Sequence, residues 1–292
     1  MRTFADFTAS VEGAAFRRAY DRVLGKWPVE VTSTDVESRF GTTRVHSCGR
    51  ADAPPVVLLP GAGATSTVWF ANVAALAENH RVHALDLLGD AGCSTAHGDP
   101  MRTADDLLSW LHAVTTGLGL DTFRLVGHSY GAMIALAFAL HRPDRVSTLV
   151  LLDPTSCFAG FRFRYLARAA PILLRPTETR ERAFIRWETD AAPIDDDWLT
   201  LLALGAEHFP TSRTIVPKRP RRAALAESPV DTTVILAADS KAHRSGRLAT
   251  TISTTMPRAH VTVLDGATHH TLPMTPADTL NAALIRALGR TT

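Results

Sequence analysis

The stretch LVGHSYGA, residues 125–132, places a serine between two glycines directly after a β-branched apolar run. The segment FRLVG predicts a strand, and the residues from Ser129 to about His141 predict a helix. A G-x-S-x-G sequence in this context is typical of a nucleophile elbow, because Gly127 and Gly131 permit a sharp turn and a close approach of strand and helix. Ser129 is therefore a candidate nucleophile, and the Tyr130 N–H is a candidate oxyanion donor. The alternative is a glycine-rich packing turn.

Length, charge and cysteine content limit the classes of protein. A chain of 292 residues that is 46% hydrophobic can bury the core of one α/β domain with an insertion. The net charge of +2 predicts no broad field for nucleic acid or an anionic membrane and favours a small neutral or mildly charged substrate. Cys48, Cys93 and Cys157 are too scattered for a disulfide framework or a zinc site and are expected to be buried thiols. No run reaches the roughly 18 apolar residues of a membrane span and no leader is recognisable, so we expect a cytoplasmic protein.

Strand-like and helix-like segments alternate along most of the chain. Residues 8–24 predict an amphipathic helix capped by Thr8 or Ser10, and two short strands are expected around Gly41. Further strands are predicted in VVLLP, RVHALDLLG, FRLVG, VSTLVLLD, TTVILAAD and AHVTVLDG. A capping box at Thr103 and Asp106 begins one intervening helix, and a last helix is expected near TPAD. This alternation is typical of a mostly parallel sheet with helices on both faces.

The alternation stops between residues 155 and 228. Arginine, tryptophan and phenylalanine alternate with prolines there, which predicts short helices without a strand. We interpret the segment as a helical lid inserted between two parts of the core, residues 1–154 and 229–292. Its FRFRYLARAAPILL stretch is expected to cover an apolar pocket rather than to touch a membrane, and RTIVPKRPRR to be solvated surface. Five aromatic residues are candidates for the pocket lining or for simple core packing: Trp187, Trp198, Phe158, Phe161 and Phe209.

A serine needs a base and electrophilic support to act as a nucleophile. The loop LLPGAG offers the Ala62 N–H as a second oxyanion donor. The same loop is a poor match to a dinucleotide-binding motif, because Ser66 stands where that motif needs its last glycine. DGATHHTLP follows the last predicted strand and offers His269 or His270 as the base, of which we prefer His269. A metal site at this pair is unfavourable because neighbouring side chains diverge and no carboxylate or thiol cluster joins them.

These motifs, in this order, resemble the α/β-hydrolase superfamily from about residue 30 onward. The matching stretches are VVLLPGAGATSTVWFANVAALAENHRVHALDLLGDAGCS, FRLVGHSYGAMIALAFALHRPDRVSTLVLLDP and VLDGATHHTLP. The resemblance implies an α/β-hydrolase fold with Ser129 as nucleophile, His269 as base, and Ala62 and Tyr130 at the oxyanion hole. Asp90 in DLLGDAGCS stands where relatives more often carry histidine, which resembles a bacterial esterase-like branch.

Two positions depart from that pattern. Pro60 replaces the usual histidine before the first loop glycine. At the usual position of the triad acid, the alignment of VILAADSKAH places Lys241, which cannot orient a histidine as a carboxylate does. Two substitutes remain open: Asp153, which closes a strand in LVLLDP, and Asp239, two positions before the lysine. The third alternative is that no carboxylate orients the histidine.

We therefore expect a serine hydrolase that cleaves an ester, thioester or lactone of a small apolar molecule, without a metal or organic cofactor. A cyclase, acyltransferase or lyase of the same fold is the alternative, followed by an inactive ligand-binding protein. A carboxylate bonded to His269 favours turnover, whereas Lys241 paired with Asp239 favours the other two. The expected partner is a small-molecule substrate, with no nucleic acid or membrane, and a homodimer is possible.

Overall fold

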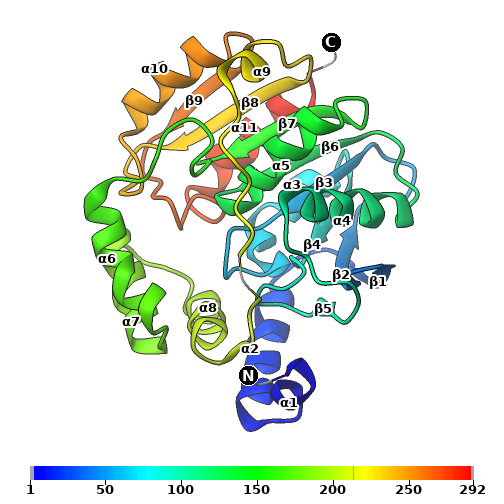
Figure 1. Cartoon of the computed structure of the whole chain (residues 1–292), viewed down its shortest axis with the longest axis vertical. Coiled ribbons are helices and arrows are strands. Elements are labelled where there is room, and N and C mark those ends of the chain that lie inside the picture. The colour runs from blue at the N-terminus through cyan, green and yellow to red at the C-terminus, as the bar shows by residue number, and fades with distance from the viewer. Residues whose placement is uncertain (1–2, 213, 291–292) are drawn as a thin grey trace.

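A nine-stranded sheet forms the centre of the protein in the computed structural model, which describes residues 3–212 and 214–290 (Figure 1). The strands run in the order β1-β2-β4-β3-β6-β7-β8-β9, and the short β5 pairs with β2. Their bounds are β1 Thr32–Ser38, β2 Gly41–Cys48, β3 Pro55–Leu59, β4 Arg81–Leu85, β5 Thr95–Ala96, β6 Phe123–His128, β7 Val146–Leu152, β8 Asp231–Ala237 and β9 His260–Leu264. The pairings of β2 with β1, β4 and β5 are antiparallel and all others are parallel, which confirms the mostly parallel sheet.

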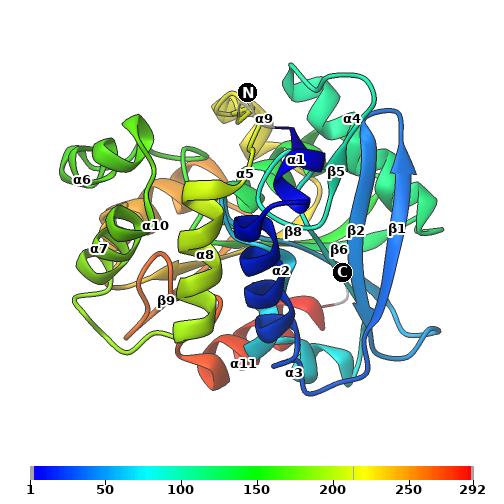
Figure 2. The same cartoon turned by 90° about the horizontal axis from the view of Figure 1, so that it is seen from below.

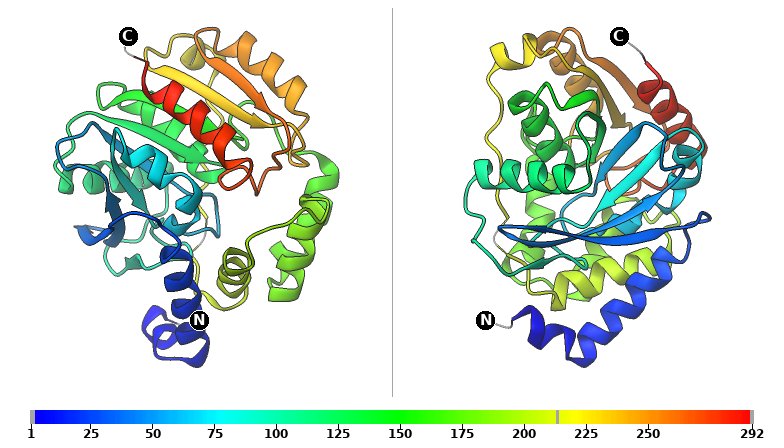
Figure 3. Two further views of the ribbon diagram at one scale, coloured as in Figure 1. Left: turned by 180° about the vertical axis from the view of Figure 1, so that it is seen from behind. Right: turned by 90° about the vertical axis from the view of Figure 1, so that its right-hand side faces the viewer.

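Helices cover both faces of the sheet because both faces are apolar. Val56 and Leu58 of β3 belong to the cluster under α3 and α11, whereas Val57 and Leu59 belong to the cluster under α4, α5 and α10. Successive side chains of a strand point to opposite faces, so an unbroken apolar run needs a helix layer on each side. Figure 2 shows the two layers, and α11 lies across one face in Figure 3.

Some of the helices begin at polar caps: the side chains of Thr3, Ser10, Thr103, Thr177 and Asp195 each accept a hydrogen bond from the first turn of the helix that follows. The helix bounds are α1 Phe4–Thr8, α2 Val11–Leu24, η1 Ser66–Ala71 (a 3-10 helix), α3 Val73–Ala77, α4 Ala104–Gly117, α5 Tyr130–His141, α6 Phe163–Leu174, α7 Glu178–Glu188, α8 Asp196–His208, α9 Arg222–Ala226, α10 Ser245–Thr255 and α11 Ala277–Leu288. Ser10, not Thr8, caps α2 by accepting from the Gly13 N–H, and Thr103 with Asp106 forms the expected capping box of α4. Sequence periodicity missed α10, whose apolar residues are few.

Four helices, α6 to α9, lie between β7 and β8, where the sequence predicted short helices. Within the described part of residues 155–228 no strand is found. Helix α8 packs beside α2 near the N-terminus (Figure 2), and Lys26 there pairs with Asp195 at 2.8 Å and with Asp197 at 2.9 Å. The end of α2 and the start of α8 therefore support each other, although 169 residues separate Lys26 from Asp195 in the chain.

The structure bears on two expectations, the burial of the cysteine thiols and the lack of a membrane-spanning helix. All three cysteines are free thiols; Cys48 and Cys157 are buried and Cys93 is partly exposed. No helix in the described ranges combines the length and apolar character that a membrane crossing requires.

Candidate active site

Ser129 occupies a strained turn between β6 and α5. Its backbone has φ +51° and ψ −109°, outside the regions that a side chain ordinarily allows, and its N–H continues the sheet by donating to the Leu152 carbonyl at 3.0 Å. The strain persists because the strand before it and the helix after it are both fixed. The serine side chain is thereby presented at the carboxyl end of the parallel strands, as a nucleophile elbow requires.

The two glycines around Ser129 are required by close backbone contact. A Cβ on Gly131 would lie 2.4 Å from the carbonyl oxygens of Leu59 and Pro60, and a Cβ on Gly127 would lie 2.3 Å from the carbonyl of Gly131. Only hydrogen atoms fit at these distances, so α5 can approach β3 and β6 only with glycine at both positions.

We predict that Gly131→Ala lowers the free energy of unfolding by about 3 kcal/mol, since backbone atoms must move to admit the methyl group. Urea denaturation followed by circular dichroism measures the change. Gly246→Ala in α10 is the matched control, because a Cβ there meets no atom within 4 Å. Its unfolding free energy should stay unchanged or rise by up to about 1 kcal/mol. Equal stability of the two variants would contradict the close-contact explanation.

An unbroken chain of hydrogen bonds joins Ser129, His269 and Asp153. The Ser129 Oγ lies 2.9 Å from His269 Nε2, and His269 Nδ1 lies 2.6 Å from Asp153 Oδ2. His269 and Asp153 are almost fully buried, so the pair is shielded from water. The structure brings together the preferred histidine and one of the two candidate acids.

Asp153 is held at the end of β7 by the sheet itself. Its N–H donates to the Ile235 carbonyl at 2.8 Å, and its carboxylate accepts from the Ala237 N–H at 3.3 Å and from the Ser240 hydroxyl at 2.8 Å. Burial alone raises the pKa of Asp153, but the hydrogen bond and charge of His269 outweigh this and hold the pKa below its ordinary value. The carboxylate is therefore ionised and oriented toward His269.

The other residues considered for these roles lie elsewhere. Asp239 is exposed and makes no hydrogen bond with His269; its N–H donates to the Ala267 carbonyl. Lys241 contacts the Trp187 carbonyl and the Asp190 carboxylate, so it pairs with neither Asp239 nor His269. His270 is not bonded to Ser129, and its Nδ1 lies 3.4 Å from Glu188 Oε2.

His128 lies beside the elbow. Its Nε2 donates to the His269 carbonyl at 2.8 Å, and burial is the main reason that its pKa falls to about 3. The ring is therefore neutral throughout the working range and helps to hold the backbone of the histidine loop.

The proposed oxyanion donors, Ala62 and Tyr130, line the same cavity as Ser129. Within the described ranges, no group accepts a hydrogen bond from either amide. Asp90 fixes this loop by accepting from the Gly63 N–H at 2.9 Å and from the Ala91 N–H at 2.8 Å. The aspartate that the sequence singled out thus connects the loop after β3 to the segment after β4.

The cavity above Ser129 has a volume of about 440 Å³ and is mainly apolar. Helices α6, α7 and α8 supply much of its wall: Leu166, Ala169, Ile172, Leu173, Phe184 and Leu202. Of the five aromatic candidates, Phe161 and Trp198 line it. The other three follow the alternative of core packing: Trp187 packs on Phe184, Phe209 packs on Phe7, and Phe158 belongs to the core under α5.

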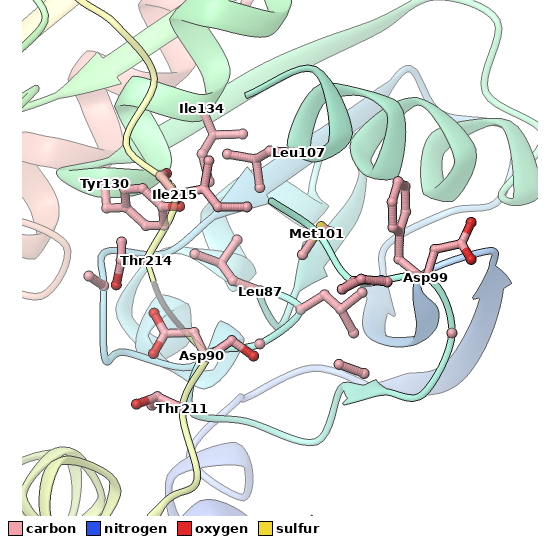
Figure 4. A pocket seen from close by; sticks show the side chains of 18 of the residues that line it. Leu87, Asp90, Asp99, Met101, Leu107, Tyr130, Ile134, Thr211, Thr214 and Ile215 are labelled. Atoms are coloured by element: carbon pink, nitrogen blue, oxygen red, sulfur yellow. Dashed lines mark hydrogen bonds between the residues drawn. The ribbon is translucent and has the colours of Figure 1, made fainter. Parts of the chain in front are cut away.

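A second cavity of about 370 Å³ adjoins the first, and Ala62, Tyr130 and Thr214 line both (Figure 4). Figure 4 shows the Asp90 carboxyl group on one side of it and the apolar Leu87, Leu107 and Ile134 on others. The Tyr130 hydroxyl donates to the Ile215 carbonyl at 2.6 Å and so fixes the partition between the cavities. Two spaces therefore meet at the candidate oxyanion donors.

Glu188, at the end of α7, is a functional candidate that the sequence did not reveal. Its fully buried carboxylate accepts from the Thr268 hydroxyl at 2.7 Å and from the N–H groups of His269 at 3.0 Å and His270 at 3.3 Å. Burial alone raises the pKa of Glu188, but His270, His269 and Thr268 together lower it to about 2. Nothing in the local sequence RWET distinguishes this glutamate from a surface residue; only its contact with a loop 80 residues away does.

We predict that Glu188→Ala lowers the free energy of unfolding by about 3 kcal/mol, because it leaves buried donors without an acceptor. Glu188→Gln keeps one acceptor oxygen and should be less destabilising. Exposed Glu30→Ala serves as the control and should change stability by less than about 0.5 kcal/mol. Urea denaturation of the three variants is the measurement, and equal effects of Glu188→Ala and Glu30→Ala would contradict the assigned contacts.

Comparison with known proteins agrees with this fold. A model of the alpha/beta hydrolase family matches residues 56–283, and the chain belongs to that family. It is 35% identical over 164 residues to the carboxylesterase YbfK of Bacillus subtilis and 35% identical over 152 residues to the uncharacterized carboxylesterase nap of the same organism. These matches cover 55% and 52% of this chain and 55% and 50% of the relatives, so the chain matches about half the length of these curated proteins.

Solved structures match over almost the whole chain. The naproxen esterase of Bacillus subtilis superposes with a TM-score of 0.87 at 26% identity, covering 95% of this chain and 98% of that one. The carboxylesterase CesB (YbfK) gives 0.89 at 25%, with coverage of 97% and 100%. The expected α/β-hydrolase fold is confirmed, and both of these similar structures are carboxylesterases.

Proposed function

We propose that the protein is a serine carboxylesterase that cleaves an ester, thioester or lactone of a small, largely apolar molecule. The observation that carries the proposal is the hydrogen-bonded chain from Asp153 through His269 to Ser129 at the floor of an apolar cavity. The names of the similar proteins, carboxylesterases in both comparisons, agree with it.

The proposed reaction follows from this geometry. His269 removes the proton of Ser129 as the Oγ attacks the acyl carbon, and the ionised Asp153 stabilises the resulting imidazolium. The Ala62 and Tyr130 amides donate to the oxyanion. As the tetrahedral intermediate collapses, the bond from the acyl carbon to the leaving oxygen or sulfur breaks, and the His269 imidazolium gives its proton to that atom, which becomes an alcohol or thiol. Water, activated by His269, then attacks the acyl-enzyme and releases the acid.

The substrate would span both cavities. The acyl group would occupy the apolar cavity under α6, α7 and α8, and the leaving group would occupy the second cavity beyond Tyr130. Residues 155–228 would then act as the lid between core parts 1–154 and 229–292. The cytoplasmic location, the absence of nucleic-acid and membrane partners and the possible homodimer stay predictions.

Labelling of Ser129 tests the proposed function. The wild-type protein, incubated with a fluorophosphonate, should gain the mass of one adduct, and Ser129→Ala should gain none. An unlabelled wild-type protein would contradict the covalent mechanism and favour the non-hydrolytic or ligand-binding alternatives. No contact of the described residues favours these alternatives, since Lys241 pairs with Asp190 and not with Asp239.

The pH dependence gives a further prediction. Burial by itself lowers the pKa of His269, but the hydrogen bond and charge of Asp153, with the charge of Glu188, raise it above the ordinary 6.5. The base must be neutral, so kcat/KM should fall as the pH decreases through a value above 6.5. Glu188→Gln removes one of the charges that raise this pKa and should move the fall to lower pH. If kcat/KM of the wild-type protein instead falls with a midpoint at or below pH 6.5, the raised pKa of His269 would be contradicted.

A further inference from the structure

One buried carboxyl group in the wall of the apolar cavity has no partner. Glu181 of α7 is only 8% exposed and lines the cavity that holds Ser129 and His269. Within the described ranges, its carboxyl group makes no hydrogen bond and no ion pair. Burial alone raises its pKa to about 7. An isolated carboxylate in apolar surroundings is unfavourable to the folded protein, so its presence needs an explanation.

Other buried carboxylates of this chain are fully bonded. Asp86 accepts from Tyr20, from Ser66 twice and from the Cys93 N–H, while Asp153 and Glu188 are bonded as described above. Each of these groups holds two or more segments of the fold together. Glu181 joins no segments, which distinguishes it from the carboxylates that stabilise the fold.

Tyr165 connects this group to the reacting residues. Its ring centroid lies 6.1 Å from that of His269 and 5.3 Å from that of Phe184, one turn after Glu181 on α7. Burial is the main cause that raises the pKa of Tyr165, and the charges of Glu188, Asp153 and Glu181 add to it. The Tyr165 hydroxyl also has no hydrogen-bond partner among the described residues and lines the same cavity. The otherwise apolar wall thus carries a carboxyl group and a phenol hydroxyl to which no described side chain is hydrogen-bonded.

We propose that Glu181 is a specificity-determining residue that binds an ammonium group at the far end of an otherwise apolar acyl chain. The inference rests on the proposed esterase function and names its substrate class: acyl esters that carry an amine remote from the scissile carbonyl. The Tyr165 hydroxyl would accept a second hydrogen bond from the same ammonium group. A cation paired with a buried carboxylate gives a charge-assisted hydrogen bond, and the apolar wall around it excludes competing water.

A pair of esters that differ only at the chain end tests the proposal. p-Nitrophenyl 6-aminohexanoate and p-nitrophenyl heptanoate have chains of equal length that end in an ammonium and a methyl group. Their kcat/KM values are measured at about pH 8, where the amine remains protonated. The kcat/KM value of the amino ester, divided by that of the methyl ester, should fall about tenfold in Glu181→Gln and further in Glu181→Leu. The reason is that both variants remove the carboxylate that would pair with the ammonium group.

Two controls separate specificity from damage to the fold. Far-UV circular dichroism of both Glu181 variants should match that of the wild type, which establishes that the fold is retained. Glu178→Gln, on the same helix but outside the cavity, should leave the ratio unchanged. An unchanged ratio in Glu181→Leu would overturn the proposal.

A binding measurement distinguishes failure of this proposal from failure of the esterase function. Octylammonium and octanol are titrated into Ser129→Ala with and without Glu181→Leu, following tryptophan fluorescence, because Trp198 lines the cavity. Loss of about tenfold in affinity for octylammonium alone would support the ammonium site even if neither ester is hydrolysed. Equal loss for both ligands, or none, would overturn it.

Discussion

Ser129→Ala is expected to lower kcat for an acyl ester by about 10⁶-fold, since the nucleophile of a serine hydrolase acts as a unit with its base. The Ser129 Oγ is the only group that the described residues place within hydrogen-bond distance of His269 Nε2. Without it, no covalent path remains, and residual hydrolysis depends on binding and oxyanion stabilisation of a water attack. Release of p-nitrophenol from p-nitrophenyl heptanoate is the measurement, with far-UV circular dichroism to establish that the variant folds.

Ser156→Ala is the matched control for this substitution. Ser156 lines the same cavity but makes no hydrogen bond to His269, so its loss should affect kcat far less. Turnover in Ser129→Ala comparable to that of the wild type would contradict the assigned nucleophile, whatever the result for Ser156.

Asp153→Asn is expected to lower kcat by about 10⁴-fold, the effect of the corresponding change in a serine protease. An asparagine preserves the shape of the side chain, but its amide stabilises the wrong tautomer of His269 and cannot stabilise the imidazolium. Asp239→Asn is the control, because Asp239 is exposed and remote from the histidine. The same p-nitrophenyl ester assay applies to both variants.

This pair of variants decides between the two acids that the sequence left open. A large loss in Asp239→Asn with a small loss in Asp153→Asn would reverse the assignment. Similar small losses in both would indicate that the histidine functions without an acid, and the pH dependence proposed for His269 would then also fail.

Local sequence patterns were sufficient for the architecture around the elbow. Gly127 and Gly131 flank a serine between a strand-like and a helix-like run, and each of these signals depends only on neighbouring residues. The order of the predicted strands and helices likewise indicated the parallel sheet, since apolar periodicity reports the burial of each segment. The position of the two histidines after the last predicted strand narrowed the base to His269 or His270, and the structure places the preferred His269 against Ser129.

The acid could not be chosen in this way. Lys241 takes the usual acid position, and Asp153 and Asp239 each follow a strand, so their local patterns are alike. The choice depends on the pairing of β7 with β8 and on the path of the loop after β9, which brings His269 to Asp153 over a separation of 116 residues. Glu188 and Glu181 are a similar case: they lie two turns apart on α7, and only packing makes one a bonded carboxylate and the other an unpaired one.

The sequence by itself determined the fold class, the elbow with Ser129 and the set of residues from which a base and an acid could come. Tertiary structure alone decided which acid faces the histidine, which aromatic residues line the cavity and where the buried glutamates lie. The physical reason is the separation along the chain of the residues that interact. Turn geometry and apolar periodicity are properties of neighbouring residues, whereas hydrogen bonds between loops and the lining of a cavity depend on how segments distant in sequence pack.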